Sequence, residues 1–298
     1  MRKNIPLLIG SILLGLLLFV MFIGPHLPFI DKNLSQERYR MDAFNKLELP
    51  AFEASEKNWI GTDKKGVDNL SKIVIAAKET IFIVIIITLI RYIIAIPLGL
   101  LSCKKKGFFH HVINALNQCF SFLPPVFATA LLLAIPFLLF TDLRLLWSIL
   151  ILAVVEAGRV AYTIQQQANQ LSRESYMEAG IALGLSSRTL VKNYYIPALL
   201  PELIVNFCID LGKVMLLIGQ LSIISIFLSH EWREVDYYTN EFVQTGLNWA
   251  ALLASHRHEI FRSQFGFVFY PAFAMMFTIV TFNLLGEGLR RHYQSTRI

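Results

Sequence analysis

The sequence predicts an all-α integral membrane protein with six transmembrane helices. Hydrophobic residues make up 55% of the 298 residues, charged residues make up 16%, and the mean hydropathy is +0.55. A composition this apolar is typical of a membrane protein. Several apolar runs also approach the ~20 residues that cross a bilayer as a helix.

The first apolar run follows two basic residues, as the apolar region of a signal peptide would. The Gly-Pro-His-Leu-Pro segment after it has no small-x-small cleavage site, so we expect an uncleaved anchor. Prolines at 124, 125 and 136 are expected to kink the third span. The six expected spans cover residues 5–23, 80–101, 112–140, 145–164, 199–228 and 267–289.

Basic residues in the connections predict the orientation of these spans. Lys and Arg residues occur at 104–106, within 173–192 and within 290–297. By the positive-inside rule these regions and both termini are cytoplasmic. Segments 31–78 and 229–264 are then expected on the outer side.

The charge and the cysteines exclude other classes of protein. The net charge is +6, but the basic residues do not form a stripe with interleaved aromatics, so no nucleic-acid surface is predicted. The three cysteines lie in or beside apolar runs without metal-ligand spacing. We expect neither a disulfide framework nor a metal site.

Small and charged residues interrupt the apolar pattern at 175–201. Apolar residues recur with helical spacing before Gly184, which suits a helix C-terminus, and two serines that can cap a second helix follow it. The second helix is expected to stop at Pro197. Such an elbow can lie on lipid or dock a protein, and its few basic residues and lack of Trp and Phe favour docking. The small residues expected to be exposed for close approach are Ala179, Gly180, Ala182 and Gly184.

The elbow resembles the EAA loop of binding-protein-dependent ABC importers, whose pattern is E-A-A, three residues, G, nine residues and I-x-L-P. The corresponding positions are Glu178, Ala179, Gly180, Gly184 and Pro197. Gly180 replaces the second alanine of the pattern, Tyr194 the isoleucine and Ile196 the leucine. Three further blocks resemble the C-type permease subunit of dipeptide, oligopeptide and nickel systems. They are the G-T-D-x-x-G-containing segment 59–72, with Val67 at an arginine position, the segment 96–101 and the F-N-L-L-G-E-G-L-R segment 282–290.

This resemblance implies the type I ABC importer transmembrane fold in the bacterial plasma (inner) membrane. It divides the chain into an anchor with an extracytoplasmic segment (1–78), a permease domain (79–290) with a coupling loop (172–197), and a cytoplasmic tail (291–298). The implied partners are a B-type permease that completes a heterodimer, two cytoplasmic ATPases and an extracytoplasmic substrate-binding protein. The EAA-like residues Glu178, Ala179, Gly180, Gly184 and Pro197 would couple the chain to an ATPase.

We expect this chain to be a translocation subunit and not an enzyme. It has no GxxxxGK[ST] phosphate loop, so ATP and Mg would bind to the partner ATPases, and no cofactor is expected on this chain. No Ser/His/Asp set or carboxylate pair lies at a common depth. An autonomous channel or membrane enzyme is the competing class, and the four ordered blocks favour the importer.

Polar residues inside the spans are candidates for the translocation path. An arginine at the membrane centre costs about 2.5–3.5 kcal/mol, so Arg91 is not expected to face lipid. Asp210 and Lys213 lie three residues apart on one helix face, as do Glu156 and Arg159, so these charges either form structural pairs or line the path. The path candidates are Arg91, Asn206, Asp210 and Lys213.

The same residues favour a peptide substrate over nickel or a metallophore. No histidine falls within the six apolar runs, and Cys119 and Cys208 have no second soft ligand nearby in the sequence. A peptide carries a charge at each end and a run of amides, which suits a path with both charge signs and an amide side chain. The expected function is the permease subunit of an ATP-driven peptide importer, with a nickel importer as the alternative.

Overall fold

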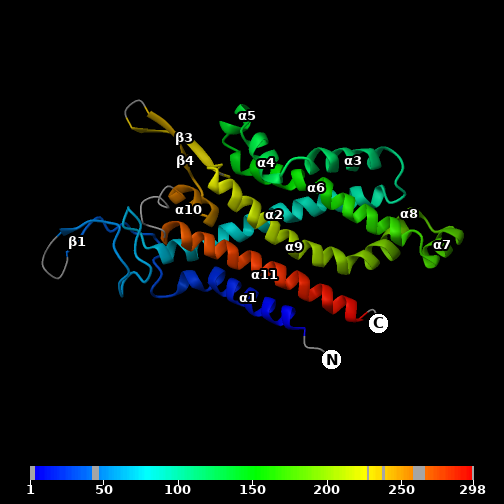
Figure 1. The fold of residues 1–298 in the computed structure, drawn as a ribbon, viewed down its shortest axis with the longest axis horizontal. Coiled ribbons are helices and arrows are strands. Elements are labelled where there is room, and N and C mark those ends of the chain that lie inside the picture. The colour runs from blue at the N-terminus through cyan, green and yellow to red at the C-terminus, as the bar shows by residue number, and fades with distance from the viewer. Residues whose placement is uncertain (1–3, 42–46, 227, 237–238, 258–265, 297–298) are drawn as a thin grey trace.

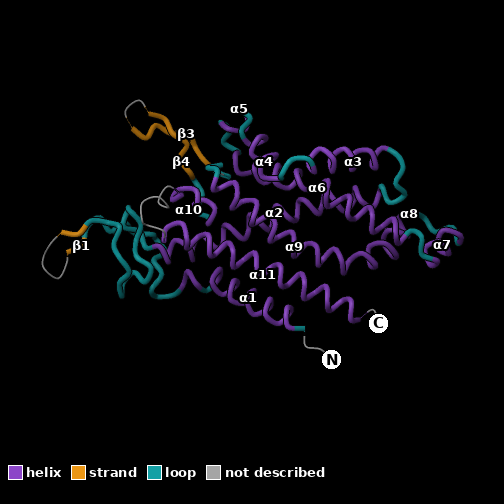
Figure 2. The backbone as a smooth tube through the Cα atoms, in the orientation of Figure 1, coloured by secondary structure: helices purple, strands orange, loops and turns teal. Residues whose placement is uncertain are grey.

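The chain folds into a bundle of long helices with a folded cap at one end (Figures 1 and 2). The computed structural model describes residues 4–41, 47–226, 228–236, 239–257 and 266–296. The long helices are α1 (Ile5–Phe22), α2 (Asn69–Leu101), α6 (Arg144–Leu171), α9 (Ile196–Ile223) and α11 (Gly266–Thr296).

Within the described residues, four helices are long and apolar enough to cross a membrane, namely α1, α2, α6 and α11. They cover the first, second, fourth and sixth expected spans. Helix α9 covers the fifth expected span but is not among these four. A multi-pass helical membrane protein is therefore confirmed, while the full set of six spans stays a prediction.

The third expected span is broken and not merely kinked, so this expectation was wrong. It consists of α3 (Phe108–Ser121), α4 (Pro125–Leu133) and α5 (Pro136–Leu139), with a bend of 94° between the first two. Pro124 is the N-cap of α4, and Pro125 and Pro136 are the first residues of α4 and α5, where the missing N–H costs nothing. The Nη1 atom of Arg144 donates hydrogen bonds to the carbonyl oxygens of Leu133 (2.6 Å) and Leu138 (3.1 Å) and so stabilises the ends of α4 and α5.

Glycines allow the long helices to approach closely at the family-like blocks. A Cβ atom on Gly99 would lie 2.7 Å from the Ile164 side chain, where α2 packs on α6. One on Gly286 would lie 2.6 Å from Ile209 on α9, and one on Gly288 would lie 2.5 Å from the backbone of Leu7 on α1. The G-E-G block therefore lets α11 pack against two helices at once.

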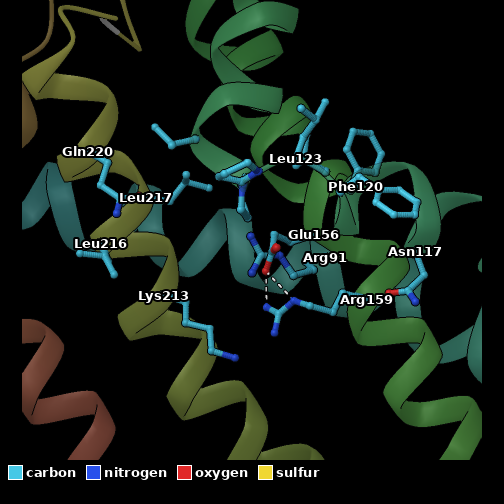
Figure 3. A pocket seen from close by; sticks show the side chains of 15 residues that line it. Arg91, Asn117, Phe120, Leu123, Glu156, Arg159, Lys213, Leu216, Leu217 and Gln220 are labelled. Carbon is cyan, nitrogen blue, oxygen red and sulfur yellow. Dashed lines mark hydrogen bonds and ion pairs between the residues drawn. The ribbon is translucent and has the colours of Figure 1, made fainter.

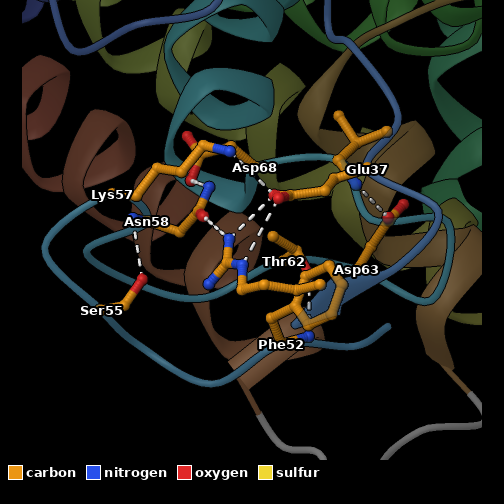
Figure 4. Close-up of polar contacts among 10 residues, drawn as sticks. Glu37, Phe52, Ser55, Lys57, Asn58, Thr62, Asp63 and Asp68 are labelled. Carbon is orange, nitrogen blue, oxygen red and sulfur yellow. Dashed lines mark hydrogen bonds and ion pairs between the residues drawn. The ribbon is translucent and has the colours of Figure 1, made fainter. Parts of the chain in front are cut away.

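The G-T-D-x-x-G block is a tight turn that starts α2 (Figure 4). The Asp63 carboxylate accepts hydrogen bonds from the backbone N–H groups of Lys65 (2.9 Å) and Val67 (2.8 Å). Gly66 has φ +76°, and a Cβ atom there would overlap the carbonyl group of Glu37. Asp68 then caps the helix by accepting from Ser71 N at 2.7 Å.

A polar network holds the rest of segment 31–68 onto this turn. Segment 31–68 includes the short antiparallel pair β1 (Arg40–Met41) and β2 (Leu47–Glu48). Arg40 donates to Glu37 (2.8 Å) and to Asn58 (2.9 Å), and Asn58 donates to Asp68 (3.0 Å). The hydrogen bond from Arg40 lowers the pKa of the Glu37 carboxyl, so this carboxylate stays ionised in the network.

The segment after α9 contains structure that the sequence analysis missed. It forms a hairpin of β3 (His230–Asp236) and β4 (Thr239–Gln244), then a short helix α10 (Trp249–His256), while residues 258–265 lie outside the described part. The Trp249 side chain is 2% exposed, and its Nε1 donates to Ile73 O of α2 at 2.8 Å. The Glu79 carboxylate accepts from Leu247 N (3.1 Å) and Asn248 Nδ2 (2.8 Å), so α10 is anchored inside the bundle.

The two ends of the bundle differ in the elements they carry. In Figure 1 the N-terminal end of α1 and the C-terminal end of α11 lie at the end of the bundle that carries the 175–195 elbow. The β1 strand, the β3–β4 hairpin and α10 lie at the opposite end (Figure 1).

Candidate functional site

The EAA-like elbow consists of two short helices joined by a defined turn. Helix α7 (Ser175–Ala182) ends in a Schellman motif, in which Gly184 N donates to Ile181 O (3.0 Å) and Leu185 N donates to Gly180 O (3.2 Å). Gly184 has φ +75°, the left-handed conformation that this motif requires. Helix α8 (Ser187–Leu190) starts at once, because the Ser186 hydroxyl accepts from Thr189 N at 3.2 Å.

Of the four small residues expected to be exposed, Ala179, Ala182 and Gly184 are exposed, but the expectation was wrong for Gly180. Gly180 is buried, and a Cβ atom there would lie 3.2 Å from the Leu190 side chain, so this glycine lets α7 pack onto α8. Glu178 and Ala179 are exposed. The exposed tip also carries Ile181 and Leu183, and Leu183 is 80% exposed.

Pro197 does not end the second helix of the elbow, so that expectation was also wrong. The chain passes from α8 through the π-helix η2 (Val191–Tyr195) directly into α9, with Pro197 in the first turn of α9. A proline inside a helix removes a hydrogen-bond donor and crowds the preceding turn. A π-helical turn widens the backbone at this position, which lets the helix continue past the proline.

A cavity of about 650 Å³ opens between α2, the α3–α4 bend, α6 and α9 (Figure 3). Its volume lies within the usual range for small-molecule sites. Most of its wall is apolar, including the phenylalanines and prolines of the α3–α4 bend. The charged side chains that line it are Arg91, Glu156, Arg159 and Lys213.

Asp210 links polar side chains of three helices, α2, α6 and α9. Its carboxylate is 4% exposed and accepts a hydrogen bond from Tyr92 Oη on α2 at 3.1 Å. Lys213 Nζ lies 3.3 Å and Arg159 Nη2 lies 3.8 Å from the Asp210 carboxylate. Arg159 is also paired with Glu156 through two hydrogen bonds to the same oxygen. Both ion pairs suggested by three-residue spacing are therefore present, and Arg159 joins them into one cluster.

The structure brings the path candidates to two neighbouring cavities. Arg91 and Lys213 line the large cavity. Asn206, Asp210 and Lys213 line a second cavity of about 180 Å³, together with Tyr92. Sequence reasoning missed Tyr92, whose only signal is a hydroxyl beside Arg91 in an apolar run.

The described residues contain no group of three or more His, Cys, Asp or Glu side chains that could hold a metal ion. The cluster at Asp210 pairs each acid with a base. Its chemistry suits the binding and passage of a charged solute and not metal coordination.

Comparison with known proteins identifies related chains. The family model described as "Binding-protein-dependent transport system inner membrane component" matches residues 95–297. A probable D,D-dipeptide transport system permease protein of Escherichia coli strain K12 is 26% identical over 97% of this chain and 88% of its own length. A dipeptide transport system permease protein of Bacillus subtilis strain 168 is 23% identical over 97% of this chain and 82% of its own length. A glutathione transport system permease protein of Pectobacterium atrosepticum is 22% identical over 79% of this chain and 72% of its own length.

Proposed function

Because this chain belongs to the family of binding-protein-dependent transport system inner membrane components, we propose that it carries peptides into the cell, together with a second permease. Family membership makes the chain a multi-pass permease subunit of an ABC importer in the plasma membrane. Support for a peptide substrate comes from relatives that cover nearly the whole chain and are named for dipeptide transport. The names of these relatives do not favour the nickel alternative.

The proposed assembly contains a B-type permease, two cytoplasmic ATPases and an extracytoplasmic binding protein. ATP and Mg would bind to the ATPases, because this sequence lacks a phosphate loop. The exposed elbow is proposed to dock into an ATPase, and Ile181 and Leu183 would supply the apolar contact. The coupling segment would contain Glu178, Ala179, Gly180, Gly184 and Pro197. In support, Leu183 is a large apolar residue at the tip of the elbow, and exposed apolar residues of this kind mark interaction sites when they cluster.

The observation that carries the proposal is the charge cluster beside the 650 Å³ cavity. A path for peptides of varied sequence needs charged and polar groups that face the ends and amides of the chain. We propose that Arg91, Asn206, Asp210 and Lys213 lie on this path. The binding protein would set the specificity.

A deletion strain tests the substrate class directly. Removing this chain is expected to abolish uptake of a radiolabelled dipeptide, and a plasmid copy is expected to restore it. A tagged copy purified in mild detergent should retain an ATPase and a second permease. Unchanged peptide uptake with lost nickel accumulation would reverse the substrate assignment, and a tagged chain that retains neither subunit would contradict the importer assembly.

The proposed topology has six spans, with both termini and the elbow on the cytoplasmic side and segments 31–78 and 229–264 outside. The permease domain would cover 79–290, between the anchor with its outer segment (1–78) and the tail (291–298). In support, the elbow lies at the same end of the bundle as the start of α1 and the end of α11 (Figure 1). The sequence places Lys and Arg residues within 173–192 and 290–297, as the positive-inside rule requires of cytoplasmic regions.

Cysteine labelling measures this topology. In a background with Cys103, Cys119 and Cys208 replaced by serine, Ala54→Cys should react with an impermeant maleimide in intact cells. Ser187→Cys should react only after the membrane is opened. Both positions are exposed, and neither side chain makes a capping hydrogen bond. Reaction of Ser187→Cys in intact cells would overturn the orientation.

A further inference from the structure

Arg91 has unused hydrogen-bonding capacity at the wall of the large cavity (Figure 3). The residue is 1% exposed, and its Nη2 atom donates to Leu152 O at 3.0 Å. Within the described residues, neither Nε nor Nη1 of Arg91 has a hydrogen-bond partner. A buried cationic donor without an acceptor is costly, so this position favours an incoming anion.

The neighbouring acids are already engaged by other groups. Glu156 accepts two hydrogen bonds from Arg159, and Asp210 is paired with Lys213 and accepts from Tyr92. No carboxylate oxygen of the described residues lies within 4.0 Å of an Arg91 nitrogen. The basic side chains therefore outnumber the acidic ones in this cluster, and among its described residues Arg91 is the basic one without an ion pair.

The wall around Arg91 favours a compact anion that enters with an apolar body. Phe120, Leu123 and Leu217 line the same cavity, and the hydrogen bond to Leu152 O fixes one nitrogen of the guanidinium. A carboxylate that leaves water for such a wall needs a charged donor to offset its lost hydration. Guanidinium–carboxylate hydrogen bonds are among the stronger ones in proteins.

We propose that Arg91 binds the C-terminal carboxylate of the peptide as it passes through the cavity. This inference rests on the proposed peptide function and assigns one end of the substrate to one side chain. The N-terminal ammonium group of the peptide has no unpaired acidic side chain to bind in the described cluster. The C-terminal carboxylate is therefore the end that this cluster binds. Recognition by Arg91 is independent of the peptide side chains, as a path for varied sequences requires.

The test compares two peptides that differ at the carboxylate. The tagged complex is purified with its native partners, reconstituted in proteoliposomes and supplied with saturating binding protein loaded with alanyl-alanine or with its C-terminal amide. In the wild type, the maximal uptake rate of alanyl-alanine should exceed that of the amide by about tenfold or more, as expected for one charged hydrogen-bonding contact. In Arg91→Gln the ratio of these two rates should fall to near one, and in Arg91→Lys it should be intermediate.

The matched control is Arg159→Gln, the same change in the same cavity at an arginine that is already paired with Glu156. It should slow both peptides and keep the wild-type ratio. The inference is wrong if the wild-type complex takes up the two peptides at nearly equal rates. It is also wrong if Arg91→Gln keeps the rate ratio of the wild type, or if Arg159→Gln loses that ratio as fully as Arg91→Gln does. If the wild-type complex takes up neither peptide, the proposed function itself fails.

Discussion

Replacing Gly184 with valine is expected to lower peptide uptake at least tenfold while the chain still inserts into the membrane. Gly184 holds φ +75° in the Schellman motif that closes α7. A β-branched residue at positive φ costs of the order of 1–3 kcal/mol, enough to displace the turn and with it the exposed tip at Leu183. Uptake and ATP hydrolysis measured in proteoliposomes should show continued hydrolysis without transport, or loss of the ATPase from the complex.

Two further substitutions test whether the loss of transport in Gly184→Val comes from the backbone conformation at this position. Gly184→Asn should keep most of the transport, because asparagine tolerates the left-handed conformation. Gly107→Val is the matched control, because Gly107 also has positive φ (+87°) and, like Gly184, no atom within 4 Å of its added Cβ, but it lies outside the elbow. Transport at the wild-type rate by Gly184→Val would rule out the elbow as a rigid coupling element.

Replacing Asp210 with asparagine is expected to lower peptide uptake about tenfold and to reduce the thermal stability of the complex. The asparagine can still accept the hydrogen bond from Tyr92, but Lys213 and Arg159 lose the carboxylate that they share. Both cations are partly exposed to the cavities, so the loss of stability should stay below the several kcal/mol of a fully buried pair. Uptake and melting temperature are measured on the same preparation.

The double variant Asp210→Asn/Lys213→Gln distinguishes a structural pair from a transport residue. Removing both charges together should restore the melting temperature, because most of the uncompensated charge is gone. Uptake should stay low if Asp210 lies on the path. Recovery of both quantities would make Asp210 and Lys213 a structural pair only.

Features that depend on local sequence could be predicted from the sequence. The apolar runs that became α1, α2, α6 and α11, the Gly184 turn and the Ser186 cap follow from periodicity and from single-residue preferences. The ion pairs at three-residue spacing belong to this class as well. Each of these features is determined by one continuous stretch of the sequence.

Features that depend on distant contacts, or on whether one helix continues into the next, could not be predicted from the sequence. Tyr92 meets Asp210 across 118 residues, and no local pattern encodes that distance. Helix α10 has eight residues, too few for a span, so only its packing on α2 reveals it as buried. Pro197 has the same sequence signature whether a helix stops there or begins its next turn, and the π-helix η2 decides between them.

The uninterrupted helix from Ser187 to Ile223 acts as a lever arm between the two halves of the proposed mechanism. At 1.5 Å per residue, about 35 Å separates Ser187 from Asp210. A tilt of about 5° at the elbow would then move Asp210 by about 3 Å, comparable to the length of its hydrogen bond with Tyr92. A small movement of the ATPase that tilts this helix at the elbow would therefore rearrange the charged side chains at the cavity. By thermodynamic reciprocity, a solute that binds to those charged side chains also shifts the preferred tilt of the helix.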